Sequence, residues 1–184
     1  ESVVKTPRQP LDQYETPPHY VKALLNVIGK PRGVVYEPCV GLWHIAEALL
    51  GKGMTLLTND LDPKRKADTH LDAAYNPDAW GTLPIDWCIT NPPFSRELPI
   101  LENAVAWCKN VAFLARLSFL EPTIERAPFW RKHPPPGLIV LPRYSFRNNK
   151  AGKRQTDSVT CCWIVWREGG SPCLSSGAAS DVLE

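Results

Sequence analysis

The sequence of 184 residues has little of several features that would point directly to a function. Its formal net charge is only +2, so any nucleic-acid partner would have to be held by a local basic patch. No apolar run approaches the length of a transmembrane helix and no signal-like start is visible, so we expect a cytoplasmic protein without membrane contact. The four histidines are scattered without ligand spacing, so we predict no metal site.

The six cysteines show no Cys-x-x-Cys spacing, and most of them lie in apolar segments. This pattern favours buried free thiols in a cytoplasmic protein over disulfides or zinc ligands. The apolar fraction of 43% and the charged fraction of 22% are ordinary for a globular protein. The length suits one domain with a sizeable core.

The most informative stretch is an apolar run, residues 85–90, that ends at Asn91-Pro92-Pro93-Phe94. The run is typical of a buried strand, and the two prolines prevent further ladder hydrogen bonds and fix φ. The Asn91 amide oxygen and the Pro92 carbonyl form a pair of acceptors suited to an –NH₂ group. Phe94 offers a ring on which a flat heterocycle can stack. The alternative interpretation is a plain strand-terminating turn.

Acidic residues lie at the carboxyl ends of two other predicted strands, 33–38 and 54–58. Glu37 lies at the end of the first, before a small-residue turn that contains Gly41 and leads into a helix at about 44–50. This order is typical of the first unit of a nucleotide-binding α/β fold, in which an acid after the second strand, here Asp60, holds a ribose diol. Asp60 could instead be a loop residue that caps the turn at Asp62.

The remaining segments complete an α/β pattern in one domain, 14–168, between an extended arm (1–13) and a disordered tail (169–184). Thr16 is expected to cap a first helix that starts at Pro17 and ends before Gly29. Further helices are predicted at 98–109 and 121–130, and further strands at 111–117, 137–141, 159–166 and possibly 70–73. The strands at 137–141 and 159–166 should pair antiparallel, because their connection has no clear helix.

Taken together, these motifs resemble the S-adenosylmethionine-dependent DNA adenine amino-methyltransferases, especially the small phage-encoded ones. The resemblance covers roughly residues 14–167. Tyr14-Glu15-Thr16-Pro17-Pro18 resembles the motif that meets the cofactor's methionine carboxylate, and Glu37-Pro38-Cys39-Val40-Gly41 resembles the cofactor loop. Asp60, with its neighbour Leu61, matches the ribose-binding acid. Asp72, with Ala73, matches the acid that contacts the cofactor's adenine amine, and residues 91–94 match the catalytic motif.

This resemblance implies a Rossmann-like methyltransferase sheet, mostly parallel with an antiparallel final strand and with helices on both faces. It implies methyl transfer from S-adenosylmethionine to the exocyclic amine of a flipped-out adenine in duplex DNA, in a host cytoplasm if the protein is phage-encoded. The connection before the last strand is basic, with no acid until Asp157. Its basic residues would contact nucleic acid. They are Arg143, Arg147, Lys150, Lys153 and Arg154.

The sequence departs from the family pattern in two ways. Trp43 stands where the cofactor loop usually has glycine, so either the loop is rearranged or the ring packs away from the ligand. Eighteen residues separate Asp72 from Asn91, so no separate target-recognition domain is expected. The alternatives are a methyltransferase acting on an RNA base or a protein amide, and a non-catalytic nucleic-acid-binding protein that keeps the fold.

Overall fold

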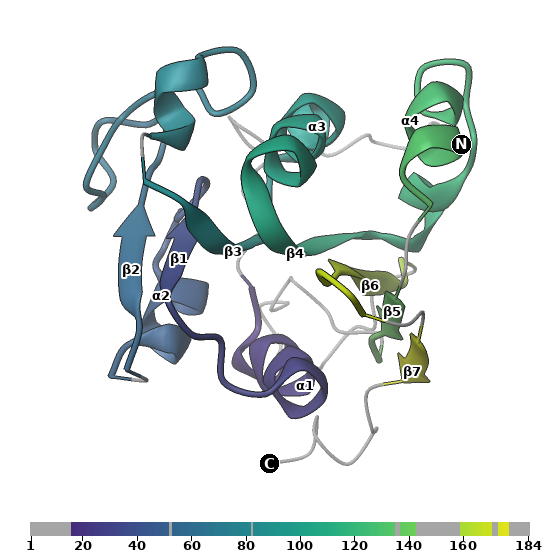
Figure 1. Cartoon of the computed structure of the whole chain (residues 1–184), viewed down its shortest axis with the longest axis horizontal. Helices are drawn as coiled ribbons and strands as arrows, with labels where there is room; N and C mark the ends of the chain where they lie inside the picture. Colours follow the sequence, from purple (N-terminus) through teal and green to yellow (C-terminus); the bar gives the residue numbers. More distant parts are fainter. Residues whose placement is uncertain are drawn as a thin grey trace, which may run out of the picture.

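The computed structural model describes residues 16–51, 53–81, 83–134, 137–142, 159–170 and 173–176, the last four as backbone. These residues form one seven-stranded sheet in the order β2-β1-β3-β4-β6-β5-β7 (Figure 1). The strands are β1 (Val34–Glu37), β2 (Thr55–Thr58), β3 (Ile85–Thr90), β4 (Cys108–Arg116), β5 (Gly137–Val140), β6 (Cys161–Trp166) and β7 (Cys173–Ser176).

The sheet is mostly parallel, which confirms the predicted fold class. Strands β1 to β4 pair in parallel, whereas β6 runs antiparallel to both of its neighbours, β4 and β5. The predicted antiparallel pairing of the strands around 137–141 and 159–166 is therefore confirmed. The expectation of disorder after Gly169 is wrong for residues 173–176, because β7 pairs in parallel with β5.

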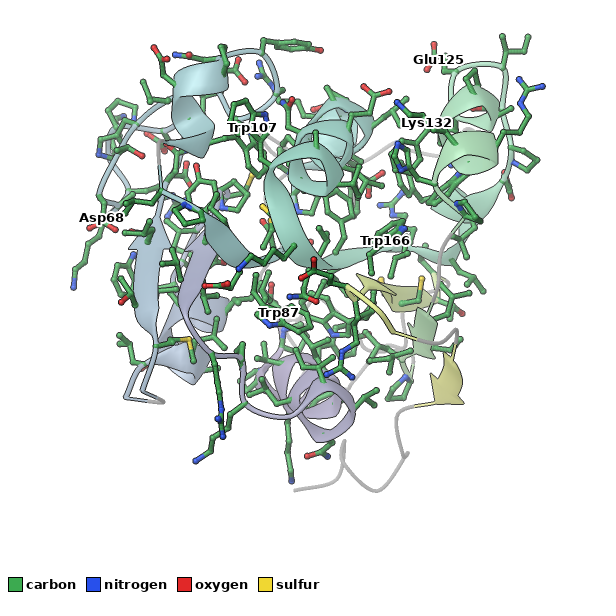
Figure 2. All side chains as sticks on the ribbon, in the orientation of Figure 1. Asp68, Trp87, Trp107, Glu125, Lys132 and Trp166 are labelled. Atoms are coloured by element: carbon green, nitrogen blue, oxygen red, sulfur yellow. The ribbon has the colours of Figure 1, made fainter. Side chains whose placement is uncertain are left out.

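Helices cover both faces of the sheet, and each face has its own core (Figure 1). Helices α1 (Pro18–Ile28) and α2 (His44–Leu49) pack on one face, around Trp87 and Trp163. Helices α3 (Glu97–Trp107) and α4 (Ala127–Lys132) pack on the other, where Trp166 lies beside α4 (Figure 2). Because both faces are covered, β3 and β4 are almost continuously buried, as their apolar runs indicate.

Several predicted boundaries move for identifiable reasons. The first helix begins at Pro18 after Pro17, and no side chain caps it, so Thr16 is not its N-cap. The helix predicted at 98–109 ends at Trp107, because Cys108 already belongs to β4. Within the segment predicted as a helix at 121–130, regular helix begins only at Ala127.

The possible strand at 70–73 is not formed; this region has only an isolated bridge between Asn59 and Thr69. The reason is that the backbone of Leu71 bonds to the Asn59 side chain instead of to a neighbouring strand. In the part of the chain that the structure describes, no helix is long and apolar enough to cross a membrane. The same residues contain no cluster of three potential metal-ligating side chains. The free cysteines are Cys39, Cys88, Cys108, Cys161 and Cys162.

Candidate active site

The predicted site residues gather where the chain changes direction in the sheet. From β1 the chain goes to β2 on one side, and later returns to β3 on the other side of β1. Open α/β sheets bind ligands at the carboxyl ends of the strands beside such a switch point. Glu37 is the last residue of β1, Asp60 lies two residues after β2, and Asn91 directly follows β3.

Glu37 is a buried acid at the centre of this edge. Its side chain is 1% exposed, and Oε2 has no hydrogen-bond partner in the structure. Burial raises the pKa of Glu37 well above its usual range, a hydrogen bond from the backbone of Ala46 opposes this rise, and the nearby Asp60 carboxylate adds to it. A buried carboxyl with an unsatisfied oxygen favours a ligand that brings hydrogen-bond donors to it.

Asp60 holds the loop at 37–41, the predicted cofactor loop, in place. Its Oδ2 accepts the N–H of Gly41 at 2.8 Å, and its Oδ1 accepts the N–H of Asp62 at 2.9 Å. Gly41 has φ +53°, and an added Cβ there would meet nothing within 4 Å, so there is open space beside the loop. The capping role of Asp60 at the Asp62 turn is thus present. The ribose contact stays a prediction.

Trp43 adopts a conformation normally reserved for glycine. Its φ is 71°, and it is the one non-glycine residue with positive φ among the described residues. Its indole Nε1 donates to the carbonyl of Lys66, whose ammonium lies 4.4 Å from the ring centroid. The ring therefore packs against the segment after β2, and the backbone keeps a left-handed turn into α2. Of the two outcomes expected for Trp43, the structure favours the second, because the ring packs against Lys66.

The left-handed φ of Trp43 predicts an unusual order of stabilities. Trp43→Gly should be more stable to urea than Trp43→Ala by about 1 kcal/mol, because alanine keeps the strain of a positive φ and glycine does not. At the neighbouring, exposed Leu42, where φ is not positive, the alanine variant should be at least as stable as the glycine variant. Equal stability of the two Trp43 variants would mean that the loop relaxes when the indole is removed.

Asn59, just after β2, links the segments at Pro38 and at 69–71, and sequence reasoning missed this role. Its side chain is fully buried, and Nδ2 donates to the carbonyls of Pro38 (3.0 Å) and Leu71 (2.9 Å). Its Oδ1 accepts from the Thr69 hydroxyl (2.8 Å) and the Leu71 N–H (2.9 Å). The side chain therefore fixes the cofactor loop relative to the 69–71 segment. An amide at a strand end was the available signal.

Asp72 and Ala73 lie in a loop anchored to α3. The Ala73 carbonyl accepts from Trp80 Nε1 at 3.0 Å and from Asn103 Nδ2 at 2.9 Å. Asp72 Oδ2 forms an ion pair with Arg96 Nη1 at 2.5 Å. Burial raises the pKa of Asp72, but Arg96 and the N–H groups of the loop outweigh it, so that the pKa is lowered and the carboxylate is charged at neutral pH.

The 91–94 turn is tied to the residues just before α1. Asn91 Nδ2 donates to Thr16 Oγ1 at 3.0 Å across 75 residues of sequence. Pro92 is buried, and the Pro93 carbonyl accepts the N–H of Arg96 at 2.9 Å, which closes the η3 turn (Phe94–Arg96). An amide side chain donates through its nitrogen and accepts through its oxygen, so Oδ1 is the acceptor atom of Asn91.

Arg116, at the end of β4, is a further site residue that the sequence did not indicate. Its guanidinium carbon lies 3.9 Å from the centroid of the Phe94 ring. Guanidinium groups stack on aromatic faces in this way and remain charged. One face of Phe94 is therefore covered by a positive charge next to the 91–94 turn.

Glu97 lies close to Arg116 and Arg126 without a hydrogen-bond partner for Oε1. It is 8% exposed. Burial raises its pKa to about 8, although the two arginines act to lower it.

This shift predicts a pH effect on stability. Between pH 4.5 and about 8 the folded protein keeps a proton on Glu97 that the unfolded chain has released, so the free energy of unfolding should fall as pH rises through this window. Glu97→Gln cannot titrate, so its urea-unfolding free energy should fall less between pH 5 and pH 8. Other groups titrate in both proteins and cancel in the comparison. Parallel pH profiles would show that Glu97 is charged in the folded state.

The other predicted residues fall into two groups. Pro17 immediately precedes α1, Pro38 is buried, Cys39 is partly exposed, and Leu61 is 40% exposed beside Asp60. Burial raises the pKa of the Cys39 thiol, and the Asp60 charge adds to it, so this thiol is not a thiolate at neutral pH. Outside the described residues lie Tyr14, Arg143, Arg147, Lys150, Lys153 and Arg154.

Comparisons with known proteins identify the fold. No protein-family model matches the chain, and no curated protein matches it. Among solved structures, a proposed RNA methyltransferase from Pyrococcus horikoshii is similar with a TM-score of 0.57 and 18% identity, over 86% of this chain and 87% of that one. The precorrin-8w decarboxylase of Methanobacterium thermoautotrophicum gives 0.53 and 17% identity, over 78% and 87%.

A third similar structure is the precorrin-6y C5,15-methyltransferase of Geobacter metallireducens. Its TM-score is 0.50 at 12% identity, over 80% of this chain and 85% of that one. At these identities the likeness concerns the fold. The chain has the Rossmann-like fold found in methyltransferases.

Proposed function

We propose that this protein transfers a methyl group from S-adenosylmethionine to the exocyclic amine of adenine in DNA. The observation that carries the proposal is the 91–94 turn at the switch point, with the Asn91 amide nitrogen held by Thr16. The turn carries two neutral oxygens, Asn91 Oδ1 and the Pro92 carbonyl, which suit the two hydrogens of an amine.

The residues at this edge fit the cofactor. The unsatisfied Glu37 Oε2 would accept from the ammonium group of the cofactor's methionine part. The open space beside Gly41 would admit the ligand next to the loop, where Asp60 would accept from the ribose hydroxyls. Asp72, whose carboxylate is charged, would accept from the adenine amine. When bound, the cofactor supplies an electrophilic methyl group.

The chain's own contribution is mainly positioning and charge stabilisation. The lone pair of the adenine amine is delocalised into its ring, so the amine is a weak nucleophile. Acceptance of both of its hydrogens by Asn91 and Pro92 would favour a pyramidal nitrogen with a directed lone pair. These hydrogen bonds strengthen as positive charge develops on the nitrogen, so they favour the transition state over the ground state. Phe94 would stack on the flipped base and offset part of its unstacking cost.

Positive charge near the turn supports a nucleic-acid substrate. Arg116 lies on Phe94 and pairs in the sheet with Cys161, the first residue of β6. Leu141 donates its N–H to the Cys161 carbonyl at 3.0 Å. Of the described residues on either side of the basic 143–154 connection, Cys161 therefore lies beside Arg116, and Leu141 lies beyond Cys161. Arginines and lysines of this connection would contact phosphates, which orient a nucleic acid without reading its sequence.

The test is transfer of labelled methyl groups to DNA, RNA and protein in parallel, followed by nucleoside analysis. The expected product is N6-methyladenine in DNA, with transfer that weakens steeply as salt concentration rises. Label found in RNA or protein alone would assign the other substrate class. Cofactor binding without transfer to any of the three would identify a non-catalytic binding protein.

The role assigned to Asp60 gives a separate prediction. Asp60→Ala should weaken S-adenosylmethionine binding about tenfold or more in calorimetry, because charge-assisted hydrogen bonds to the ribose are lost along with the anchor of Gly41. Asp68→Ala is the matched control, since Asp68 accepts two hydrogen bonds from Thr58 in the same region and has no proposed ligand contact. If both variants bind the cofactor as tightly as the parent, Asp60 serves the turn alone.

A further inference from the structure

Arg96 connects two parts of the proposed active site that are far apart in sequence. Its Nη1 lies 2.5 Å from Asp72 Oδ2, across 24 residues. Asp72 belongs to the segment that follows β2, whereas Arg96 is the last residue of the η3 turn that begins at Phe94. One ion pair therefore joins the proposed adenine-binding acid to the turn that would hold the target base.

The Asp72 end of this pair is well fixed. Oδ1 accepts the N–H of Ala74 at 3.0 Å, so the carboxylate is oriented by its own loop. Asn103 on α3 donates to the carbonyls of both Ala73 (2.9 Å) and Ala74 (3.1 Å). A carboxylate has about four acceptor positions. A further donor brought by a ligand can therefore share Asp72 with Arg96 or compete with it.

The Arg96 end is part of the turn itself. The backbone N–H of Arg96 donates to the Pro93 carbonyl at 2.9 Å, and α3 begins at the next residue. The guanidinium also lies 5.7 Å from the ring of Tyr75, in the same loop as Asp72. The residue whose side chain Asp72 holds is thus the residue whose N–H closes the turn.

We propose that Arg96 is a positioning residue that couples occupancy of the adenine subsite at Asp72 to the geometry of the 91–94 turn. This inference rests on the proposed function, since it takes Asp72 as the acceptor for the cofactor's adenine amine. Donation from that amine occupies an acceptor position of Asp72 and so changes the hydrogen bonds that Asp72 offers to Arg96. Binding at the adenine subsite and the geometry of the turn are then coupled by a free energy. Cofactor binding then orders the turn before the target base arrives.

Amide hydrogen exchange of residues 94–97 tests the coupling without DNA. S-adenosylhomocysteine, which has the same adenosine group but no methyl to transfer, is the probe. In the parent protein it should slow exchange of these amides at least about threefold, the scale expected of a partly exposed ion pair. In Arg96→Met the same saturating ligand should leave the exchange unchanged, whereas Arg96→Lys, which keeps the charge, should restore part of the effect.

Lys109→Met is the matched control, because Lys109 forms a similar ion pair with Asp86 (2.8 Å) away from the proposed site. It should keep the ligand-induced slowing. Equal slowing in the parent and Arg96→Met, or its loss in Lys109→Met as well, would overturn the coupling. Failure of S-adenosylhomocysteine to bind the parent would overturn both this inference and the proposed function. Slowing through Arg96 without methyl transfer to DNA would refute the DNA activity alone.

Discussion

Asn91→Ala is expected to reduce methyl transfer at least about 100-fold, because it removes an acceptor whose hydrogen bond strengthens in the transition state. Cofactor affinity should stay within about tenfold of the parent, since one lost neutral contact is worth about 1.4 kcal/mol or less. Single-turnover rates of labelled-methyl transfer and calorimetric titration with S-adenosylmethionine measure the two effects separately.

A variant that removes the hydrogen bond from Asn91 to Thr16 should have a smaller effect on methyl transfer. Thr16→Val keeps the shape of the side chain and removes the hydroxyl that orients the amide. Its transfer rate should fall about tenfold, less than that of Asn91→Ala, because the acceptor is present but less well aligned. If Asn91→Ala lost cofactor binding and transfer to the same extent, the 91–94 turn would be a structural feature of the cofactor site.

The largest loss of stability is expected for Asn59→Ala. The change leaves the carbonyls of Pro38 and Leu71, the Leu71 N–H and the Thr69 hydroxyl without their partner. Of these partners Pro38 is buried, Leu71 is partly buried and Thr69 is exposed, so water can replace the bond to Thr69. A buried group left unpaired costs about 1–3 kcal/mol, so the free energy of unfolding in urea should fall by about 2–4 kcal/mol. Cofactor affinity should fall as well, because the cofactor loop loses its attachment to the 69–71 segment.

Asn110→Ala is the control for Asn59→Ala. Asn110 is also an asparagine with hydrogen bonds at both ends of its amide, to the carbonyl of Asp86 (2.8 Å) and from the N–H of Glu168 (3.0 Å), but it is only partly buried. Water can replace these partners, so a loss of about 1 kcal/mol and an unchanged cofactor affinity are expected. Similar losses for the two variants would show that water reaches the Asn59 network too.

The sequence by itself determined the fold class and the location of the candidate site. Apolar runs such as residues 85–90 and 111–117 are signals of buried strands that depend on residues close in sequence. The prolines after Asn91 determine where the chain leaves the sheet, since they limit φ and remove N–H donors locally. The order of strands, acids and turns then placed Glu37, Asp60 and Asn91 at one edge, because parallel strands end on the same side.

The tertiary structure alone decided which side chains hold one another. The contacts of Thr16 with Asn91, Arg96 with Asp72 and Arg116 with Phe94 each join segments more than 20 residues apart or on different strands. Local periodicity contains no information about such pairs. For the same reason the local pattern at Thr16 predicts a helix cap, whereas in the structure its hydroxyl accepts from Asn91 at the end of β3. At residues 70–73, hydrogen bonds to the Asn59 side chain take the place of the predicted short strand. The Asn59 side chain is fully buried, so its polar atoms must be paired.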